Sequence, residues 1–305
     1  MDNASTDGSP QMVAREFPEA RLIRNQVNAG FARANNQGLA PAQGEAVLFL
    51  NQDAEIRPGA ITAMAHYLQA RPEAGAVGAW LLNPDGSFQN YFHRFPTPAL
   101  SFFCETELGK RFDRSFLRGR LGRRYRCQDV DFAQVVRLDQ PPAACLMVKR
   151  ALLSRIGGMD ERFPIFFNDV DLCRRIWRAG FEIHLARHAH VLHHLAQSTR
   201  SLPRAEEARL RSLLAYFRKH YGLPGALVWK TLLLLDCCYC GLMTLRNRIG
   251  ARTALRQFFQ NRLQTYLAVL GRSSEKRFRA GLPCPSGQAQ LVPRKFAQMQ
   301  RGGLG

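Results

Sequence analysis

Acidic residues are scarce in this chain, and the resulting positive charge indicates what kind of molecule binds to it. The 305 residues include 24 Asp and Glu against 43 Lys and Arg, a formal net charge of +19. From Thr199 onward there are 19 basic and 4 acidic residues, so +15 of the +19 lies in the last third. A negatively charged partner is therefore predicted: nucleic acid, anionic lipid or a phosphorylated substrate. Nucleic acid is the least favoured, because no nucleic-acid-binding motif is recognisable and the basic excess flanks an apolar helix.

The chain also lacks a disulfide framework. Its eight cysteines are scattered through ordinary apolar contexts, without the spacing of a disulfide-rich secreted domain. A cluster at 237–240 has a CxxC spacing, but no second pair accompanies it, so we expect helix-face packing or acylation there rather than zinc. The first residues are polar, and no secretory signal is expected from them. A reducing cytoplasm is the compartment consistent with both observations.

No uninterrupted apolar run reaches the roughly 20 residues that a membrane-spanning helix needs. The main candidate, residues 227–245, is broken by Lys230 and Asp236. Four arginines follow it: Arg246, Arg248, Arg252 and Arg256. This pattern favours a helix that lies in the interface of an anionic membrane. The alternative is an apolar helix packed on the rest of the protein.

The C-terminal third is expected to be helical up to a basic tail. Residues 202–221 form an amphipathic pattern that Gly222 and Pro224 end. We therefore predict a helical, membrane-interface region at 201–271, placed on the inner face of the cell membrane. Residues 272–305 are predicted to be a disordered tail, because they are basic and contain Gly and Pro.

Residues 1–200 alternate short apolar runs with amphipathic segments. Apolar runs of strand length occupy 46–50, 76–82 and 143–148, and 181–185 is a further strand candidate. Such runs are typical of strands buried on both faces, so the pattern predicts an α/β fold with a largely parallel sheet. Asp53 follows the first run. Because the carboxyl ends of strands form the ligand crevice in open α/β sheets, Asp53 is a candidate site residue.

The region between the second and third apolar runs is less regular. Residues 111–126 are rich in arginine and aromatic side chains. We expect them to form a solvated, mobile basic loop. The alternative is a clamp for a phosphorylated acceptor, because arginine recognises phosphate groups well.

The stretch 163–181 carries the clearest local signal. Asn168 is a good helix N-cap, and Asp169 and Asp171 fall in the first turn after it. Arg175 lies four residues after Asp171, an arrangement that supports a helix. The stretch therefore predicts a short helix with carboxylates at its positive end. These carboxylates either complement the helix dipole alone or also form part of an active site.

Four segments together carry a family resemblance: 2–9, 28–35, 48–53 and 166–175. In order and spacing they resemble the inverting glycosyltransferases of family 2, which have a GT-A-type, Rossmann-like fold that binds nucleotide sugars. The nearest likeness is to the rhamnosyltransferase-like branch that builds bacterial surface polysaccharides. The resemblance covers about residues 1–200, the expected catalytic domain. It implies transfer of a sugar such as rhamnose, with inversion, from a nucleotide-diphosphate donor to a lipid-linked or polysaccharide acceptor.

The resemblance also implies roles for single residues. Asp53 matches the DxD-type element and would hold a divalent metal, Mg²⁺ or Mn²⁺, on the donor diphosphate. His193 matches a histidine after the last strand and would be a further ligand, with His194 the less favoured choice. Asp169 would be the general base, which a helix N-terminus would keep ionised. On the nucleotide side the matching residues are Asp2, near the nucleobase, and Asn28, Gly30 and Asn35.

The sequence departs from the family pattern in three places. Asn168 stands where the family usually has Glu, and residues 195–197 stand where it usually has a glycine-rich run. Met1 lies where the family's first strand should end, so we expect the chain to lack that strand, which helps to bind the nucleotide. The alternative function is accordingly an inactive, shortened member that binds a nucleotide sugar or a membrane without turnover.

Overall fold

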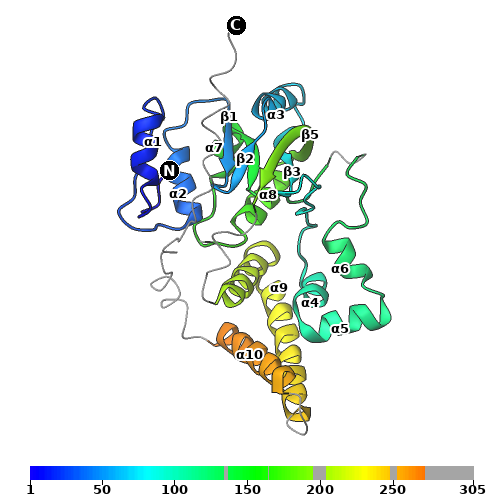
Figure 1. Cartoon of the computed structure of the whole chain (residues 1–305). Coiled ribbons are helices and arrows are strands. Elements are labelled where there is room, and N and C mark those ends of the chain that lie inside the picture. The colour runs from blue at the N-terminus through cyan, green and yellow to red at the C-terminus, as the bar shows by residue number, and fades with distance from the viewer. Residues whose placement is uncertain (134–136, 164, 195–203, 248–252, 272–305) are drawn as a thin grey trace.

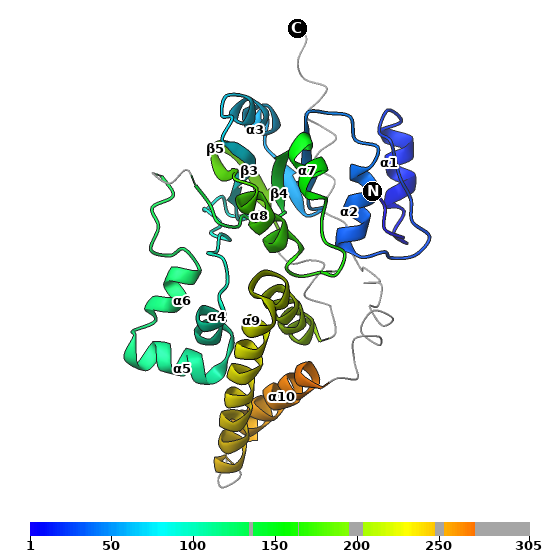
Figure 2. The same cartoon turned by 180° about the vertical axis from the view of Figure 1, so that it is seen from behind.

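The computed structural model describes every residue of the chain except 134–136, 164, 195–203, 248–252 and 272–305. The predicted tail at 272–305 and the expected domain boundary at 200/201 therefore lie outside the described residues, as do Arg248, Arg252 and residues 195–197. In Figures 1 and 2 the sheet and the helices around it occupy one end of the molecule, and a group of helices occupies the other.

One five-stranded sheet lies at the centre of the first part. Its strands are β1 (Ala46–Leu50), β2 (Ala54–Ile56), β3 (Ala74–Leu82), β4 (Cys145–Lys149) and β5 (Glu182–His193), in the order β1-β4-β3-β5-β2. Only β3 and β5 pair in parallel, whereas β1–β4, β3–β4 and β2–β5 are antiparallel. The prediction of an α/β fold is confirmed, but the prediction of a largely parallel sheet is wrong in its detail. A buried apolar run reports burial on both faces and not strand direction, so the reversal of β4 left no signal in the sequence.

Helices cover both faces of this sheet. They are α2 (Phe31–Leu39), α3 (Ala60–Gln69), α7 (Arg150–Ile156) and α8 (Asn168–Arg178), with α1 (Ser9–Glu16) beyond α2. Alternate residues of β4 point to opposite faces: Leu146 packs with Ile176 of α8, and Met147 packs with Met64 of α3. The strand therefore contributes to two apolar cores, one on each side.

The segment between β3 and β4 forms three helices: α4 (Pro98–Glu105), α5 (Glu107–Phe116) and α6 (Arg120–Tyr125). The expected mobile loop at 111–126 is therefore wrong. The Thr106 hydroxyl caps α5 by accepting the Gly109 N–H at 3.1 Å. The buried Asp113 carboxylate accepts the N–H groups of Leu121 and Gly122 at 3.1 and 3.0 Å, which ties α6 to α5.

Two further helices, α9 (Ala205–Arg246) and α10 (Thr253–Leu270), pack against each other beside α4 and α5. The helix α9 is kinked at Gly222, whose φ of 69° favours glycine, so the predicted break is present. A third apolar core joins Trp229 and Tyr216 of α9 to Tyr266 of α10 and to Phe163, which precedes α8. By length and composition alone, α9 is the one helix in the described residues that reaches the size and apolarity of a membrane span.

Candidate active site

Asp53 and His193 meet at one edge of the sheet. The strands β1, β3 and β5 all run in one direction, because β4 lies antiparallel between β1 and β3 and β5 is parallel to β3. Asp53 follows the end of β1, and His193 is the last residue of β5, where it pairs with Ala54. Both side chains are mostly buried, and His193 Nε2 lies 3.4 Å from Asp53 Oδ1. The two residues that the sequence pointed to therefore lie side by side.

Gln89 sets the proton position on His193. Its side-chain NH₂ donates to the His193 carbonyl and to Asn83 Oδ1, both at 2.9 Å, which orients the amide. Gln89 Oε1 then lies 2.8 Å from His193 Nδ1. An amide oxygen only accepts, so Nδ1 carries the proton and donates it. In the neutral ring the lone pair of Nε2 then faces the Asp53 carboxylate, and Nε2 makes no hydrogen bond within the described part of the chain.

A buried lone pair opposite a carboxylate is the geometry of two ligands that share a cation. Without a proton or a metal ion between them, the two atoms repel each other, and the buried Nε2 has lost its hydration. A metal-ligating histidine commonly donates its other N–H to an oxygen that fixes the ring, as His193 does to Gln89. The described residues contain no group of three or more His, Cys, Asp or Glu that could hold a metal. Mg²⁺ and Mn²⁺ take ligands from substrate phosphates and water as well, so a two-residue set fits a metal that arrives with a diphosphate.

His194 is oriented differently from His193. Its Nε2 lies 2.7 Å from Glu55 Oε1, on the neighbouring strand β2. Successive residues of an extended chain point to opposite sides, so only one of the two histidines can face Asp53. Of the two, His193 is the one that does.

Asp169 lies in a separate cavity of about 260 Å³. The polar and aromatic residues that line this cavity include Tyr91, His93, Tyr125, Phe166 and Arg209. Asp169 is at the second position of α8, where its Oδ1 accepts the Val170 N–H at 2.8 Å and its Oδ2 accepts the Ala143 N–H at 3.4 Å. Aromatic rings beside a carboxylate provide both a stacking surface for a sugar and a proton acceptor.

Burial raises the pKa of the Asp169 carboxyl, although the N–H groups of Val170 and Ala143 act to lower it. This net direction differs from the expectation that the helix N-terminus would dominate. The consequence for chemistry is favourable, since a base is more effective when its pKa lies closer to the working pH.

The Asp53–His193 pair and the Asp169 cavity adjoin the same short piece of backbone. The Asn51 N–H, two residues before Asp53, donates to the Ala144 carbonyl at 3.0 Å. The preceding residue, Ala143, donates to Asp169. The segment 89–93 runs along both, because Gln89 holds His193 while its later residues line the cavity.

Asp2, Asn28 and Gly30 gather around the first turn of the chain. Asn3, which the sequence did not single out, joins them: its Nδ2 donates to Asn28 Oδ1 at 2.7 Å, and its Oδ1 accepts the Ala29 N–H at 2.8 Å. The backbone of Asp2 forms an isolated parallel β-bridge with Arg24, and Asp2 Oδ1 accepts the Ser5 N–H at 3.1 Å.

Gly30 and Asn35 are placed by α2. Gly30 is its N-cap with φ 83°, a conformation that a Cβ would strain. Asn35 lies on the helix itself, and its Nδ2 donates to the Phe31 carbonyl at 2.8 Å. The structure therefore groups Asp2, Asn28 and Gly30 closely, with Asn35 one helical turn further along.

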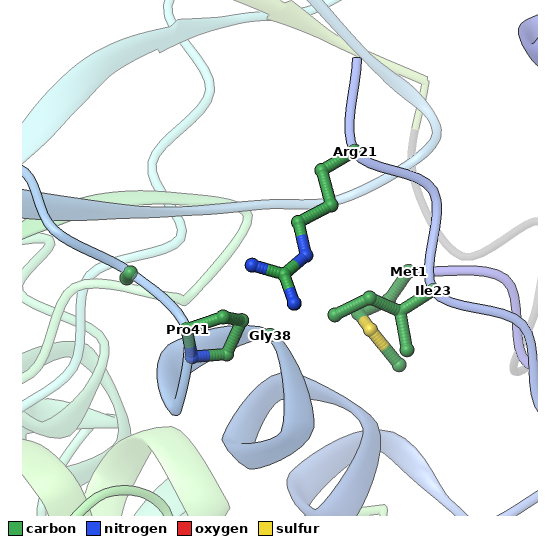
Figure 3. Close-up of a pocket in the computed structure, with 6 residues that line it drawn as sticks. Met1, Arg21, Ile23, Gly38 and Pro41 are labelled. Atoms are coloured by element: carbon green, nitrogen blue, oxygen red, sulfur yellow. The ribbon is translucent and has the colours of Figure 1, made fainter.

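A further cavity, of about 310 Å³, lies beside Met1 (Figure 3). Arg21 extends its guanidinium group toward Pro41, and Ile23 lies next to Met1 on the other side. None of the predicted site residues lines this cavity, so it is distinct from the two groups described above.

The residues that sequence reasoning missed are Gln89, Tyr91 and His93. An Asp85–Gly86 turn precedes them, and Phe88 bridges back to Leu82 of β3. That dipeptide is a hairpin signal, so it could have predicted the return of the chain to the sheet edge. It could not have predicted which side chain meets His193, because that residue lies 104 positions after Gln89.

The fold and site define an α/β protein with a candidate metal-ligand pair at one sheet edge and a candidate base in a cavity nearby. Residues 1–132 match the model of the family Glycosyl transferase family 2. The N-acetylglucosaminyl-diphospho-decaprenol L-rhamnosyltransferase of Mycobacterium tuberculosis is 28% identical over 86% of this chain and 86% of its own. The rhamnosyltransferase WbbL of Escherichia coli K12 is 24% identical over 62% of this chain and 70% of its own. Among solved structures, the mannosyltransferase PcManGT of Pyrobaculum calidifontis is 18% identical, with a TM-score of 0.48, over 88% of this chain and 74% of its own.

Residues 1–132 thus carry the match to glycosyltransferase family 2, and the two rhamnosyltransferases are similar to the chain over most of its length. The predictions of the family, of the GT-A-type fold class and of glycosyl transfer are thereby confirmed.

Proposed function

We propose that this protein transfers rhamnose from a nucleotide-diphosphate donor to a lipid-linked or glycan acceptor, with inversion, in the synthesis of a cell-surface polysaccharide. The observation that carries the proposal is the approach of His193 Nε2 to Asp53 Oδ1 at 3.4 Å, together with the nearby cavity that Asp169 lines. The similar Mycobacterium protein is named for rhamnosyl transfer to a lipid diphosphate, which supports both the sugar and the acceptor class.

The proposed mechanism gives each polar group one task. Asp53 and His193 would hold Mg²⁺ or Mn²⁺, which would supply positive charge to the departing diphosphate. Asp169 takes the proton from the acceptor hydroxyl as that oxygen bonds to the anomeric carbon. The bond from this carbon to the donor phosphate oxygen breaks at the same time, so attack from the opposite face inverts the configuration. Aromatic rings of the cavity, such as Tyr91 and Tyr125, stack against the sugar.

The nucleotide is proposed to lie along the first turn and α2. Asp2 is assigned to the nucleobase, and Asn28, Gly30 and Asn35 to the nucleotide side. The amide bonds that Asn3 makes to Asn28 and Ala29 support this assignment, because they hold the two segments in one position before a ligand arrives.

The protein is proposed to act in the cytoplasm on the inner face of the cell membrane, with 1–200 as catalytic domain and 201–271 as membrane-interface region. Support comes from apolar side chains that the helices leave exposed beyond the Gly222 kink: Leu227, Val228, Leu234, Leu235, Leu242 and Leu245. Exposed apolar surface of this extent is unusual on a monomeric protein in water.

Asp169→Asn tests the proposal. Turnover of nucleotide-diphospho-rhamnose with a short-chain N-acetylglucosaminyl-diphospho-lipid should fall by roughly 10² to 10⁴, the usual contribution of a positioned base. Donor binding measured by calorimetry should persist, because the substitution preserves shape and the proposed metal ligands remain. Asp169→Glu keeps a carboxylate and should retain more turnover. Chelation of divalent metal should abolish turnover in all three proteins.

The pH profile provides the control. Because burial raises the pKa of Asp169, kcat/KM should decrease with falling pH at values above the ordinary range of an aspartate. This acid limb should be absent from the residual activity of Asp169→Asn. An Asp169→Asn enzyme with near-normal turnover would place the base elsewhere.

A further inference from the structure

The helices α5 and α6 form an arm with exposed aromatic side chains. Phe112 is 43% exposed and Phe116 is 73% exposed, and their rings lie 4.8 Å apart at the outer side of α5. Phe103 of α4 extends the row, with its ring 5.9 Å from that of Phe112. Burial of an aromatic ring is favourable, and rings that stay exposed to water forgo that free energy. A row of exposed rings therefore indicates a surface that is covered when the protein binds a partner.

The same arm is strongly basic on its outside. Its exposed arginines include Arg111, Arg114, Arg118, Arg120, Arg123 and Arg124. Both acidic residues of the arm are used internally: Glu107 pairs with Lys110 and Arg262, and Asp113 accepts backbone N–H groups of α6. The outward charge is therefore positive without local neutralisation, which is complementary to an anionic surface.

The arm is fixed to the helices that carry the exposed leucines. Asp236 of α9, which interrupts the apolar run, is fully buried and accepts the N–H groups of Glu107 and Leu108 at 3.0 and 2.6 Å. It thereby caps the start of α5. Arg262 of α10 donates to Glu107 at 2.8 Å. In both views the arm and the far half of α9 lie side by side, at the end of the molecule away from α1 and α3 (Figures 1 and 2).

We infer that the α5–α6 arm is a second membrane-docking element. Its arginines bind anionic lipid headgroups, and Phe112 and Phe116 insert into the membrane at the depth of these headgroups. This inference rests on the membrane location in the proposed function and extends it to a surface outside residues 201–271. Cationic side chains beside aromatic ones are the composition of interfacial amphipathic elements. Because Tyr125 of α6 lines the Asp169 cavity, docking of the arm holds that cavity close to the membrane, where a lipid-linked acceptor lies.

The test is binding to vesicles of phosphatidylcholine and phosphatidylglycerol. The triple variant Arg111→Gln, Arg114→Gln, Arg118→Gln should bind about 100-fold more weakly, at about fivefold for each arginine near an anionic surface. A matched control removes three exposed arginines from the opposite end, Arg15→Gln, Arg57→Gln and Arg71→Gln, and should bind within about threefold of the parent. Phe112→Ser with Phe116→Ser should weaken binding about tenfold or more, and the exposed Phe17→Ser should not.

The substituted positions are exposed at the surface, so we expect the variants to fold. Turnover on a water-soluble acceptor checks this, and it should stay within about twofold of the parent value. If the parent binds vesicles and the arginine triple binds equally well, the inference fails while the proposed function stands. If the triple keeps vesicle binding but loses turnover on the soluble acceptor, the arginines serve the acceptor phosphates and the inference is wrong. If the parent binds no anionic vesicles, the membrane location fails together with the inference, and transfer activity is judged separately.

Discussion

At the scale of single residues, the hydrogen bond between Gln89 and His193 makes a specific prediction. Gln89→Leu removes the acceptor of His193 Nδ1–H, which releases the ring and its tautomer. The affinity for Mn²⁺, measured by calorimetry with a nucleoside diphosphate present, should fall about 10- to 100-fold, as is usual when a partner of a metal-ligating histidine is lost. The ¹⁵N shifts of the imidazole should show Nε2–H appearing in a fraction of the molecules.

Gln89→Glu is the matched control. It keeps an acceptor for Nδ1–H at the same position, so both metal affinity and tautomer should stay closer to the parent. It loses the two bonds that the amide NH₂ donates to His193 O and Asn83, so stability should fall for both variants alike. Unchanged Mn²⁺ affinity and tautomer in Gln89→Leu would show that Gln89 has a structural role only.

These two residues also show what the sequence could predict about the site. Asp53 was predictable because it follows an apolar strand, and His193 because the family resemblance implied it. The strands β1 and β5 run in the same direction to one edge, which brings the two residues together. Gln89 was not predictable, since a glutamine in a turn carries no chemical signal until its partner is known. The raised pKa of Asp169 was likewise missed, because burial by distant segments outweighs the local effect of the helix end.

At the scale of elements, Asp171 joins α8 to the first half of α9. It is fully buried, and it contacts Arg175 Nε at 2.8 Å, His220 Nε2 at 2.8 Å and Lys219 Nζ at 2.5 Å. Burial acts to raise the pKa of Asp171, but the bond from His220 and the charges of Arg175 and Lys219 outweigh it, and the pKa is lowered. The predicted pair with Arg175 is confirmed, and the two contacts from α9 add to it.

Asp171→Asn should therefore reduce stability more than chemistry. The free energy of unfolding should fall by about 3 kcal/mol, because basic partners remain around a buried position that has lost its charge. Since the pKa is lower in the folded state, this stabilisation is complete above the ordinary aspartate range and is lost as the pH falls through the lowered value. Denaturant unfolding at neutral pH measures the change.

An exposed acidic residue gives the comparison. Glu16 pairs with Arg15 at the surface, and Glu16→Gln should change stability by less than about 0.5 kcal/mol. Turnover per folded molecule should fall less in Asp171→Asn than in Asp169→Asn. If Asp171→Asn lost as much turnover as Asp169→Asn and kept its stability, the assignment of Asp169 rather than Asp171 to the chemistry would be wrong.

Elements with local signals were predicted well, and those fixed by distant contacts were not. The helix over 168–178 follows from its charges and apolar spacing, but its N-cap is Phe167 with φ 69°, since Asn168 instead donates to the Ile165 carbonyl at 3.0 Å. Residues 111–126, most of which belong to the arm, were predicted to be a loop because they are rich in arginine. The start of the arm depends on Asp236, which lies more than a hundred positions away.

At the scale of the whole molecule, the structure changes how membrane binding has to be tested. Removing residues 223–256 would delete Trp229 and Leu233 from the core that they share with Tyr266 and Phe163. Such a deletion would unfold the helical end, so loss of membrane binding would not show what binds. The exposed side chains of α9 can be changed without that consequence, because they make no part of this core.

The last prediction is that the intact protein lies on the membrane and does not span it. If the far half of α9 crossed the bilayer, Asp236 and the start of α5 that it caps would enter the hydrocarbon, together with Lys110 and Arg111. Charged groups at that depth cost about 2.5 to 3.5 kcal/mol each on insertion scales. Alkaline carbonate should therefore extract the full-length chain from membranes.

Substitutions of leucines in α9 test the same placement. The double variant Leu234→Gln, Leu242→Gln changes two exposed side chains and should weaken vesicle binding about tenfold or more without lowering stability. The variant Leu233→Gln changes an equally apolar but buried side chain and should lower stability by several kcal/mol. A chain that resists carbonate extraction would be an integral membrane protein, and the interfacial placement of both α9 and the arm would be wrong.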